Sequence, residues 1–104
     1  MAKTRQDKAM AALERAAGGP LTIGRALWAI RECDEISQAV FAKRLGISAQ
    51  HLCDIEKGRR APRAARAAKW AKVLGYSPEQ FAELALQAEL DAAGLKLRAR
   101  VKAA

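Results

Sequence analysis

Residues 37–58 read SQAVFAKRLGISAQHLCDIEKG, and this stretch decides the fold. It predicts two short helices, because Ser37 and Ser48 are both good N-cap residues and each precedes helix-forming residues with apolar side chains at helical spacing. A glycine follows each run and is a typical helix stop. Only Ile47 separates Gly46 from Ser48, so a tight turn must join the two helices.

Each of these helices is expected to have one buried and one exposed face. The apolar residues Val40, Phe41 and Leu45 predict the inner face of the first helix, and Leu52 and Ile55 that of the second. Two helices joined in this way suggest a helix-turn-helix, in which the first helix crosses the DNA backbone and the second enters the major groove. The outward residues of the second helix that we expect to contact bases are Ala49, Gln50, Cys53 and Asp54.

The outward residues differ in what they can recognise. Gln50 lies in the first turn of its helix, where base edges are read, and its amide can make a two-point contact with adenine. Ala49 is small enough for close approach and can contact a thymine methyl group. Asp54 is acidic where DNA is expected to be close; it would accept from a cytosine amino group, orient a neighbouring basic side chain, or weaken binding. Cys53 is interpreted as an inert small residue, because nothing nearby except Lys57 would lower its pKa.

Apolar spacing on both sides of this pair predicts three more helices. The first begins after the N-cap Thr22 and ends near Glu32, and the second spans residues 63–74. The third begins at Ser77-Pro78-Glu79, where a cap, a proline at the first helical position and an early acidic residue follow one another, and a glycine at position 94 ends it. The sequence therefore predicts an all-α domain of five helices over residues 21–94.

The two ends of the chain have different patterns. Residues 1–20 are expected to form a separate helical arm, since residues 4–17 are good helix formers and Gly18-Gly19-Pro20 breaks the helix. The tail, residues 95–104, begins LKLRARVK, and its alternation of apolar and basic residues predicts a short strand. A single strand is not stable by itself, so it would pair with the rest of the chain, with a second copy, or with another protein.

The charge distribution points to a polyanionic partner. The 104 residues include 19 Lys and Arg against 11 Asp and Glu, which gives a net charge of +8. Residues 21–75 hold eleven basic and five acidic side chains, whereas residues 76–104 are neutral. Nucleic acid is the leading candidate partner for a basic segment of this kind. Residues placed to contact phosphates are Lys43, Ser48, Lys57, Arg59, Arg60 and Arg63, whereas Lys69 and Lys72 are expected to face solvent.

Several functional classes are excluded by the composition. The chain is too short for a two-domain cofactor enzyme, and it shows neither a nucleophile–base pair nor a phosphate-binding loop. One histidine, His51, and two cysteines, Cys33 and Cys53, have no metal-ligand spacing, so we expect no metal and no cofactor. No apolar run is long enough for a membrane span, and Glu14 and Arg15 interrupt any signal-peptide segment. The expected location is the cytoplasm, in association with the nucleoid.

The motifs SQ (37–38), LGIS (45–48) and IExG (55–58) occur together at a spacing that resembles the lambda-repressor-like, XRE-type helix-turn-helix domain over residues 22–75. This resemblance implies that Gln38 contacts phosphate and braces the recognition helix, and that Arg31 and Glu56 form a structural ion pair. The further residues that carry the resemblance are Arg31, Ala39, Phe41, Ala42 and Leu52.

A longer pattern extends over most of the chain. The segments LTIGRALWAIRE, ISAQHLCDIEKGRR, AAKWAKVLGYSPEQFAELALQ and GLKLRARV are similar to antitoxin regulators of bacterial toxin–antitoxin modules, of the HigA kind. Two functions therefore compete. One is a repressor that binds double-stranded DNA as a homodimer on an inverted repeat, because one recognition helix reads only a few base pairs. The other is an antitoxin that masks a toxin protein and autoregulates its operon.

Overall fold

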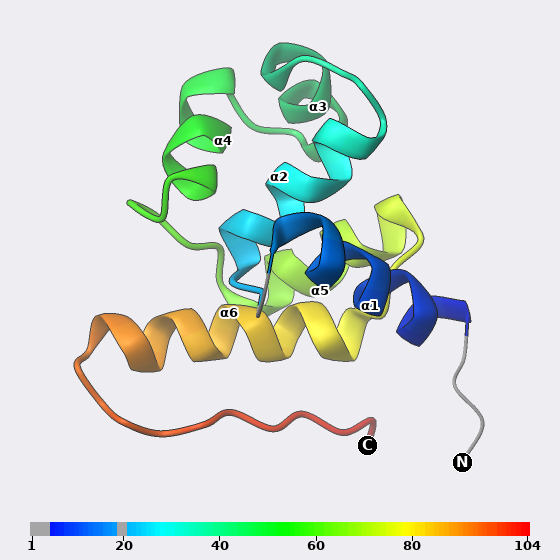
Figure 1. Cartoon of the computed structure of the whole chain (residues 1–104). Helices are drawn as coiled ribbons and strands as arrows, with labels where there is room; N and C mark the ends of the chain where they lie inside the picture. Colours follow the sequence, from blue (N-terminus) through cyan, green and yellow to red (C-terminus); the bar gives the residue numbers. More distant parts are fainter. Residues whose placement is uncertain (1–4, 19–20) are drawn as a thin grey trace.

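The computed structural model describes residues 5–18 and 21–104, and in these ranges it is all-α (Figure 1). None of the described residues forms a β-strand. Residues 1–4 of the expected arm, and the Gly19-Pro20 part of its expected helix break, lie outside the described ranges. The helices are α1 (Arg5–Ala17), α2 (Ile23–Cys33), α3 (Gln38–Leu45), α4 (Ala49–Glu56), α5 (Ala64–Leu74) and α6 (Pro78–Ala92).

Local hydrogen bonds explain where four of these helices begin. In each case an N-cap hydroxyl oxygen accepts from the backbone N–H three residues later, which satisfies a donor that has no partner within the helix. The caps are Thr22 (to Arg25, 3.1 Å), Ser37 (to Val40, 3.2 Å), Ser48 (to His51, 3.0 Å) and Ser77 (to Gln80, 3.2 Å). Helix α3 ends at Gly46, whose φ of 77° lies in the left-handed region that favours glycine.

Helix α1 is part of the core and does not stand apart as an arm. Its side chains Met10 and Leu13 are 6% and 3% exposed and belong to the same hydrophobic cluster as residues of α2 to α6. Arg25 of α2 donates to the carbonyl of Ala17, the last residue of α1, at 2.9 Å, and its guanidinium lies 4.6 Å from the ring centre of Trp28. The described chain thus packs six helices around one core, instead of five helices with a separate arm.

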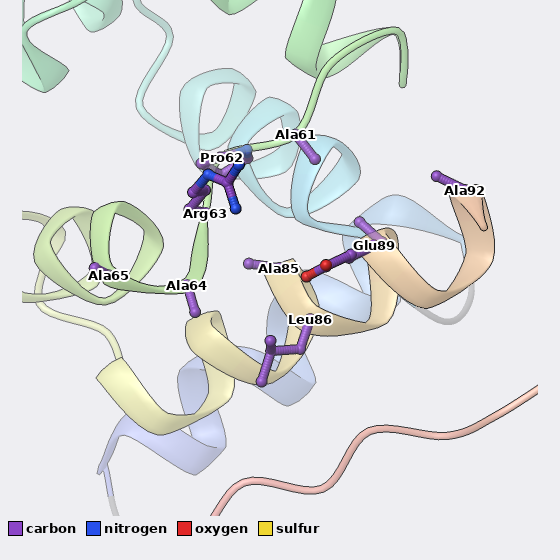
Figure 2. Close-up of a pocket in the computed structure, with 10 residues that line it drawn as sticks. Ala61, Pro62, Arg63, Ala64, Ala65, Ala85, Leu86, Glu89 and Ala92 are labelled. Atoms are coloured by element: carbon purple, nitrogen blue, oxygen red, sulfur yellow. The ribbon is translucent and has the colours of Figure 1, made fainter. Parts of the chain in front are cut away.

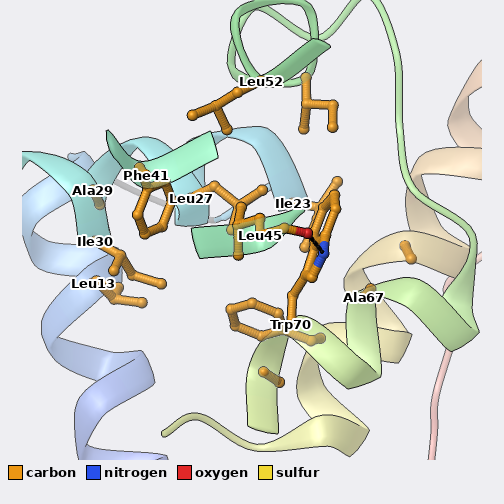
Figure 3. Packing of buried hydrophobic residues seen from close by; sticks show 14 of the residues in the cluster. Leu13, Ile23, Leu27, Ala29, Ile30, Phe41, Leu45, Leu52, Ala67 and Trp70 are labelled. Carbon is orange, nitrogen blue, oxygen red and sulfur yellow. Dashed lines mark hydrogen bonds between the residues drawn. The ribbon is translucent and has the colours of Figure 1, made fainter. Parts of the chain in front are cut away.

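The core contains a bond that connects α5 to the helix-turn-helix. Trp70 of α5 is 3% exposed, and its indole N–H donates to the carbonyl of Leu45 at 3.0 Å (Figure 3). Leu45 is the last residue of α3, so no backbone N–H within that helix donates to its carbonyl. Without Trp70 the carbonyl of the buried residue Leu45 would lose this hydrogen-bond donor.

Val40 is an exception to the predicted inner face of α3. It is 53% exposed, whereas Phe41, Ala42 and Leu45 are buried. Successive residues of a helix are separated by about 100° of rotation. The buried stripe through residues 41, 42 and 45 therefore turns Val40 away from the core.

The C-terminal strand that we expected is not formed. Residues 95–104 are extended and run back along α6, but they pair with no second strand in the described chain (Figure 1). Gln87 of α6 holds the tail instead: its side-chain N–H donates to the carbonyl of Leu97 at 2.9 Å, and its oxygen accepts from the backbone N–H of Ala99 at 2.8 Å. Arg100 lies 3.4 Å from Glu83. A side-chain amide thus supplies the hydrogen bonds that a strand edge would have supplied.

Candidate nucleic-acid interface

Helix α4 presents a polar surface because its apolar residues point into the core. Leu52 and Ile55 are fully buried, while Ala49 and Gln50 are exposed. Cys53 and Asp54, the other two residues predicted to contact bases, are half-buried at the edge of this surface. The structure thus places the four predicted residues on one side of α4, with the first turn the most accessible.

Asp54 organises its polar neighbours. Its carboxylate accepts a hydrogen bond from the side-chain amide of Gln50 at 3.0 Å and lies 3.6 Å from the guanidinium of Arg59. Its backbone carbonyl also accepts from the N–H groups of Arg59 at 2.8 Å and Arg60 at 3.3 Å, which shapes the loop after α4. The bond to Asp54 uses one amide hydrogen of Gln50. The second hydrogen and the amide oxygen can still make a two-point contact with adenine.

Beneath this surface, Glu56 connects three helices. Its carboxylate forms a bidentate ion pair with Arg31 of α2, at 2.8 Å to Nε and 3.0 Å to Nη2, and accepts from Gln38 of α3 at 2.9 Å. The side chains of Arg31 and Glu56 are 13% and 4% exposed. The hydrogen bond from Arg31 to Glu56 raises the pKa of Arg31 above its ordinary value, so this residue stays charged. The amide of Gln38 is therefore directed at the last residue of α4, which positions α3 against α4.

Gly24 is a residue of this framework that our sequence reasoning did not single out. It is buried in α2, at the point where α2 meets the last turn of α4. A Cβ atom at this position would collide with the backbone carbonyl oxygen of Ile55 and would lie 3.4 Å from the Cα of Glu56. Only glycine permits this close approach of the two backbones. The available clue was a glycine inside an otherwise helical segment, which is unfavourable unless packing requires it.

Most residues predicted to contact phosphates lie around α4. Lys43, Lys57, Arg59 and Arg60 are exposed. Ser48 is also exposed, and its hydroxyl oxygen caps α4 while its O–H can still donate to a phosphate.

Arg63 differs from the other predicted phosphate contacts. It lines a groove of about 570 Å³ between the start of α5 and α6, together with Glu89 and several alanines (Figure 2). Arg63 is exposed and is the N-cap residue of α5.

Positive charge gathers near the first turn of α4. The pKa of His51 is lowered from its ordinary value, first because burial disfavours the charged imidazolium and then because Arg60 and Arg66 repel it. The nearby carboxylate of Asp54 opposes this shift. His51 is therefore predominantly neutral at neutral pH, and the two arginines mark a basic region beside the exposed turn.

Neither a group of metal ligands nor a membrane-spanning helix occurs in the described ranges. No group of three or more His, Cys, Asp or Glu residues there is arranged to hold a metal ion. None of the helices in residues 5–18 and 21–104 combines the length and apolar character needed to span a bilayer. Cys33 and Cys53 are free thiols.

Two capped helices across a glycine turn, with a buried framework beneath a polar second helix, define a helix-turn-helix protein. A helix-turn-helix family model matches residues 29–81, just over half of the chain, and the chain belongs to this family, in its XRE-type form. It is 42% identical over 59 residues, 57% of this chain and 86% of the relative, to the "Uncharacterized HTH-type transcriptional regulator YazB" of Bacillus subtilis (strain 168). No solved structure matches the chain significantly.

Proposed function

We propose that this protein is a sequence-specific transcriptional regulator that binds double-stranded DNA and acts as a repressor. The observation that carries the proposal is the exposed first turn of α4, where Asp54 holds the amide of Gln50 by a 3.0 Å hydrogen bond. A side chain held in this way loses less conformational entropy when it contacts a base. The name of the Bacillus subtilis relative, an HTH-type transcriptional regulator, supports the same function. Such a protein would act in the cytoplasm, on the nucleoid.

In this proposal the residues divide into two groups by what they contact. Bases are read by Ala49, Gln50, Cys53 and Asp54 from the major groove. Because α4 has only eight residues, one copy reads a few base pairs, and a homodimer on an inverted repeat with half-sites about one DNA turn apart supplies the specificity. The phosphate contacts are Gln38, Lys43, Ser48, Lys57, Arg59, Arg60 and Arg63.

The test begins with selection of bound sequences from a random duplex pool, followed by gel-shift titration of the selected site. Gln50→Ala should relax the preference at one position of the half-site by about 1–3 kcal/mol, since it removes a base contact. A full-length protein that selects no sequence, and binds no duplex even at low salt, would contradict the proposal.

Arg59→Ala should weaken binding to all duplexes alike and reduce the slope of log K against log salt by about 0.9, as expected for one phosphate contact. Lys72→Ala is the matched control, because Lys72 is exposed on α5 and is not among the predicted contacts, so it should change neither quantity. A loss confined to the selected sequence would rule out the assigned role of Arg59.

A second candidate function is an antitoxin that masks a toxin and autoregulates its operon. The extended tail favours it, because Leu95 and Leu97 are 47% and 58% exposed there. Exposed apolar residues on an extended segment suit pairing with a partner protein. The test is to co-express this protein with the product of the reading frame that lies next to its gene. If that frame arrests growth and the full chain relieves the arrest, a chain ending at Gly94 should fail to do so.

A further inference from the structure

A basic groove lies between the end of α3 and α5, and none of its lining residues belongs to α4. Its volume is about 350 Å³. Its charged lining residues are Lys43 and Arg44 of α3 and Arg66 and Lys69 of α5, and no acidic residue of the described chain lines it. Lys69 is exposed, as expected for a solvent-facing residue, and the fold also brings it together with three other cations.

The cations of the basic groove are not neutralised by the described chain. Its ion pairs use other arginines, namely Arg31, Arg59 and Arg100. Arg66 lies over the ring of Trp70 instead, 6.0 Å from its centre. Like charges gathered in one concave site repel one another and raise the local concentration of anions. The groove is therefore an electrostatic site for a ligand that carries several negative charges.

The floor of the groove is connected to the turn of the helix-turn-helix. Trp70 lines the groove, and its indole N–H is bonded to the carbonyl of Leu45, next to Gly46 (Figure 3). Val73, which is 54% exposed, adds an apolar wall beside the cations. A ligand in this groove would thus contact both α3 and α5 at the place where their hydrogen bond holds the turn.

We propose that the basic groove binds two or more phosphate groups of one ligand. The four cations on two helices carry more positive charge than one phosphate group compensates, so they match a ligand with at least two phosphates. The apolar wall suits the organic part of a nucleoside di- or triphosphate, whereas two successive phosphates of a DNA strand offer the same charged groups. Lys43 is among the phosphate contacts assigned above, but Arg44, Arg66 and Lys69 are not, so the site extends beyond the proposed function.

The experiment uses the full chain labelled with ¹⁵N and follows its two indole N–H resonances. The Trp28→Phe variant identifies the Trp70 resonance. Inorganic pyrophosphate and ATP, each without added metal, are titrated at constant ionic strength.

The groove variant is Arg66→Gln/Lys69→Gln. Its matched control, Lys72→Gln/Lys102→Gln, removes the same charge from exposed positions outside the groove. Thermal unfolding of both variants verifies that they are folded. If the double groove variant is not folded, the single variant Lys69→Gln replaces it in the titrations.

A free ligand is indicated if pyrophosphate or ATP shifts the Trp70 resonance saturably, and if the groove variant weakens this binding roughly three- to tenfold while the control does not. DNA is indicated if neither probe shifts Trp70 but the groove variant lowers the salt slope of duplex binding by about 1.8 relative to the control. The proposal is overturned if neither effect is seen, or if the control variant shows the same loss. Base preference measured through Gln50 is independent of these outcomes, so failure of the groove leaves the proposed function intact.

Discussion

Replacing Glu56 with alanine should strongly destabilise the fold, because its carboxylate is the shared acceptor of side chains from two other helices. It receives two hydrogen bonds from Arg31 and one from Gln38, between 2.8 and 3.0 Å, and its side chain is 4% exposed. Glu56→Ala removes all three bonds. It leaves a guanidinium that is 13% exposed with only the carbonyl of Ile36 at 3.2 Å and the carboxylate of Glu32 at 3.6 Å.

The expected loss follows from this geometry. Removing one partner of a buried ion pair costs about 3–5 kcal/mol of unfolding free energy, because the other charge is left uncompensated. Arg31 keeps two acceptors and some contact with water, so we expect the lower end of this range, about 3 kcal/mol. In a domain of this size each kcal/mol lowers the Tm by about 4–8 °C, so the fall should be about 12–24 °C.

The assay is urea unfolding followed by circular dichroism at pH 7, applied to Glu56→Ala and to a double-mutant cycle. The cycle compares the wild type with Glu56→Leu, Arg31→Met and the double variant. Two apolar side chains can replace a buried ion pair at little cost, so the double variant should lose at least about 2 kcal/mol less than the sum of the single losses. Glu32→Ala is the control: this residue contacts Arg31 but is 53% exposed, and its loss should stay under about 0.5 kcal/mol. Additive losses in the cycle would refute the reasoning.

Two further predictions concern stability. Gly24→Ala should destabilise the protein by about 2 kcal/mol, because overpacking against the backbone of Ile55 costs more than the roughly 1 kcal/mol that alanine adds in helix propensity. An unchanged or raised Tm would show that α2 and α4 can move apart at little cost in stability, which would contradict the prediction. The lowered pKa of His51 should make stability fall as the pH drops from about 6.5 toward 5, since the unfolded state then binds the proton more readily. The urea midpoint of His51→Gln should fall less over this interval, and parallel curves would contradict this assignment.

The helices of this protein were predictable because their start and stop signals are local. A cap such as Ser37 or Ser48 bonds to a backbone N–H only three residues away, and Gly46 needs no distant contact to adopt its positive φ. The helix predicted over residues 63–74 is observed as α5, Ala64–Leu74, so its bounds agree within one residue. The outward residues of α4 followed from helical spacing once its buried residues had been identified.

Other features of the structure depended on contacts that local sequence patterns do not reveal. Spacing left three alternatives for Asp54, and only the folded loop after α4 brought Arg59 beside it. The alternating pattern of the tail predicted a strand. That pattern could not reveal that the side chain of Gln87 would bond to the tail's backbone groups in place of a second strand. Spacing also assigned Val40 to the core, because a helix of eight residues does not by itself define the centre of its buried stripe.

The sequence by itself therefore determined the class of fold, the helix-turn-helix and the residues that α4 turns outward, because these follow from hydrogen bonds and side-chain periodicity within one or two turns. Only the tertiary structure decided that α1 joins the core, that Gly24 meets Ile55, and that cations from α3 and α5 gather in one groove. Lys43 and Lys69 are far apart along the chain, so their proximity depends on how α5 packs against α3, for which Trp70 supplies the connecting hydrogen bond. Such contacts are set by how complete helix surfaces fit together, and no local pattern encodes that fit.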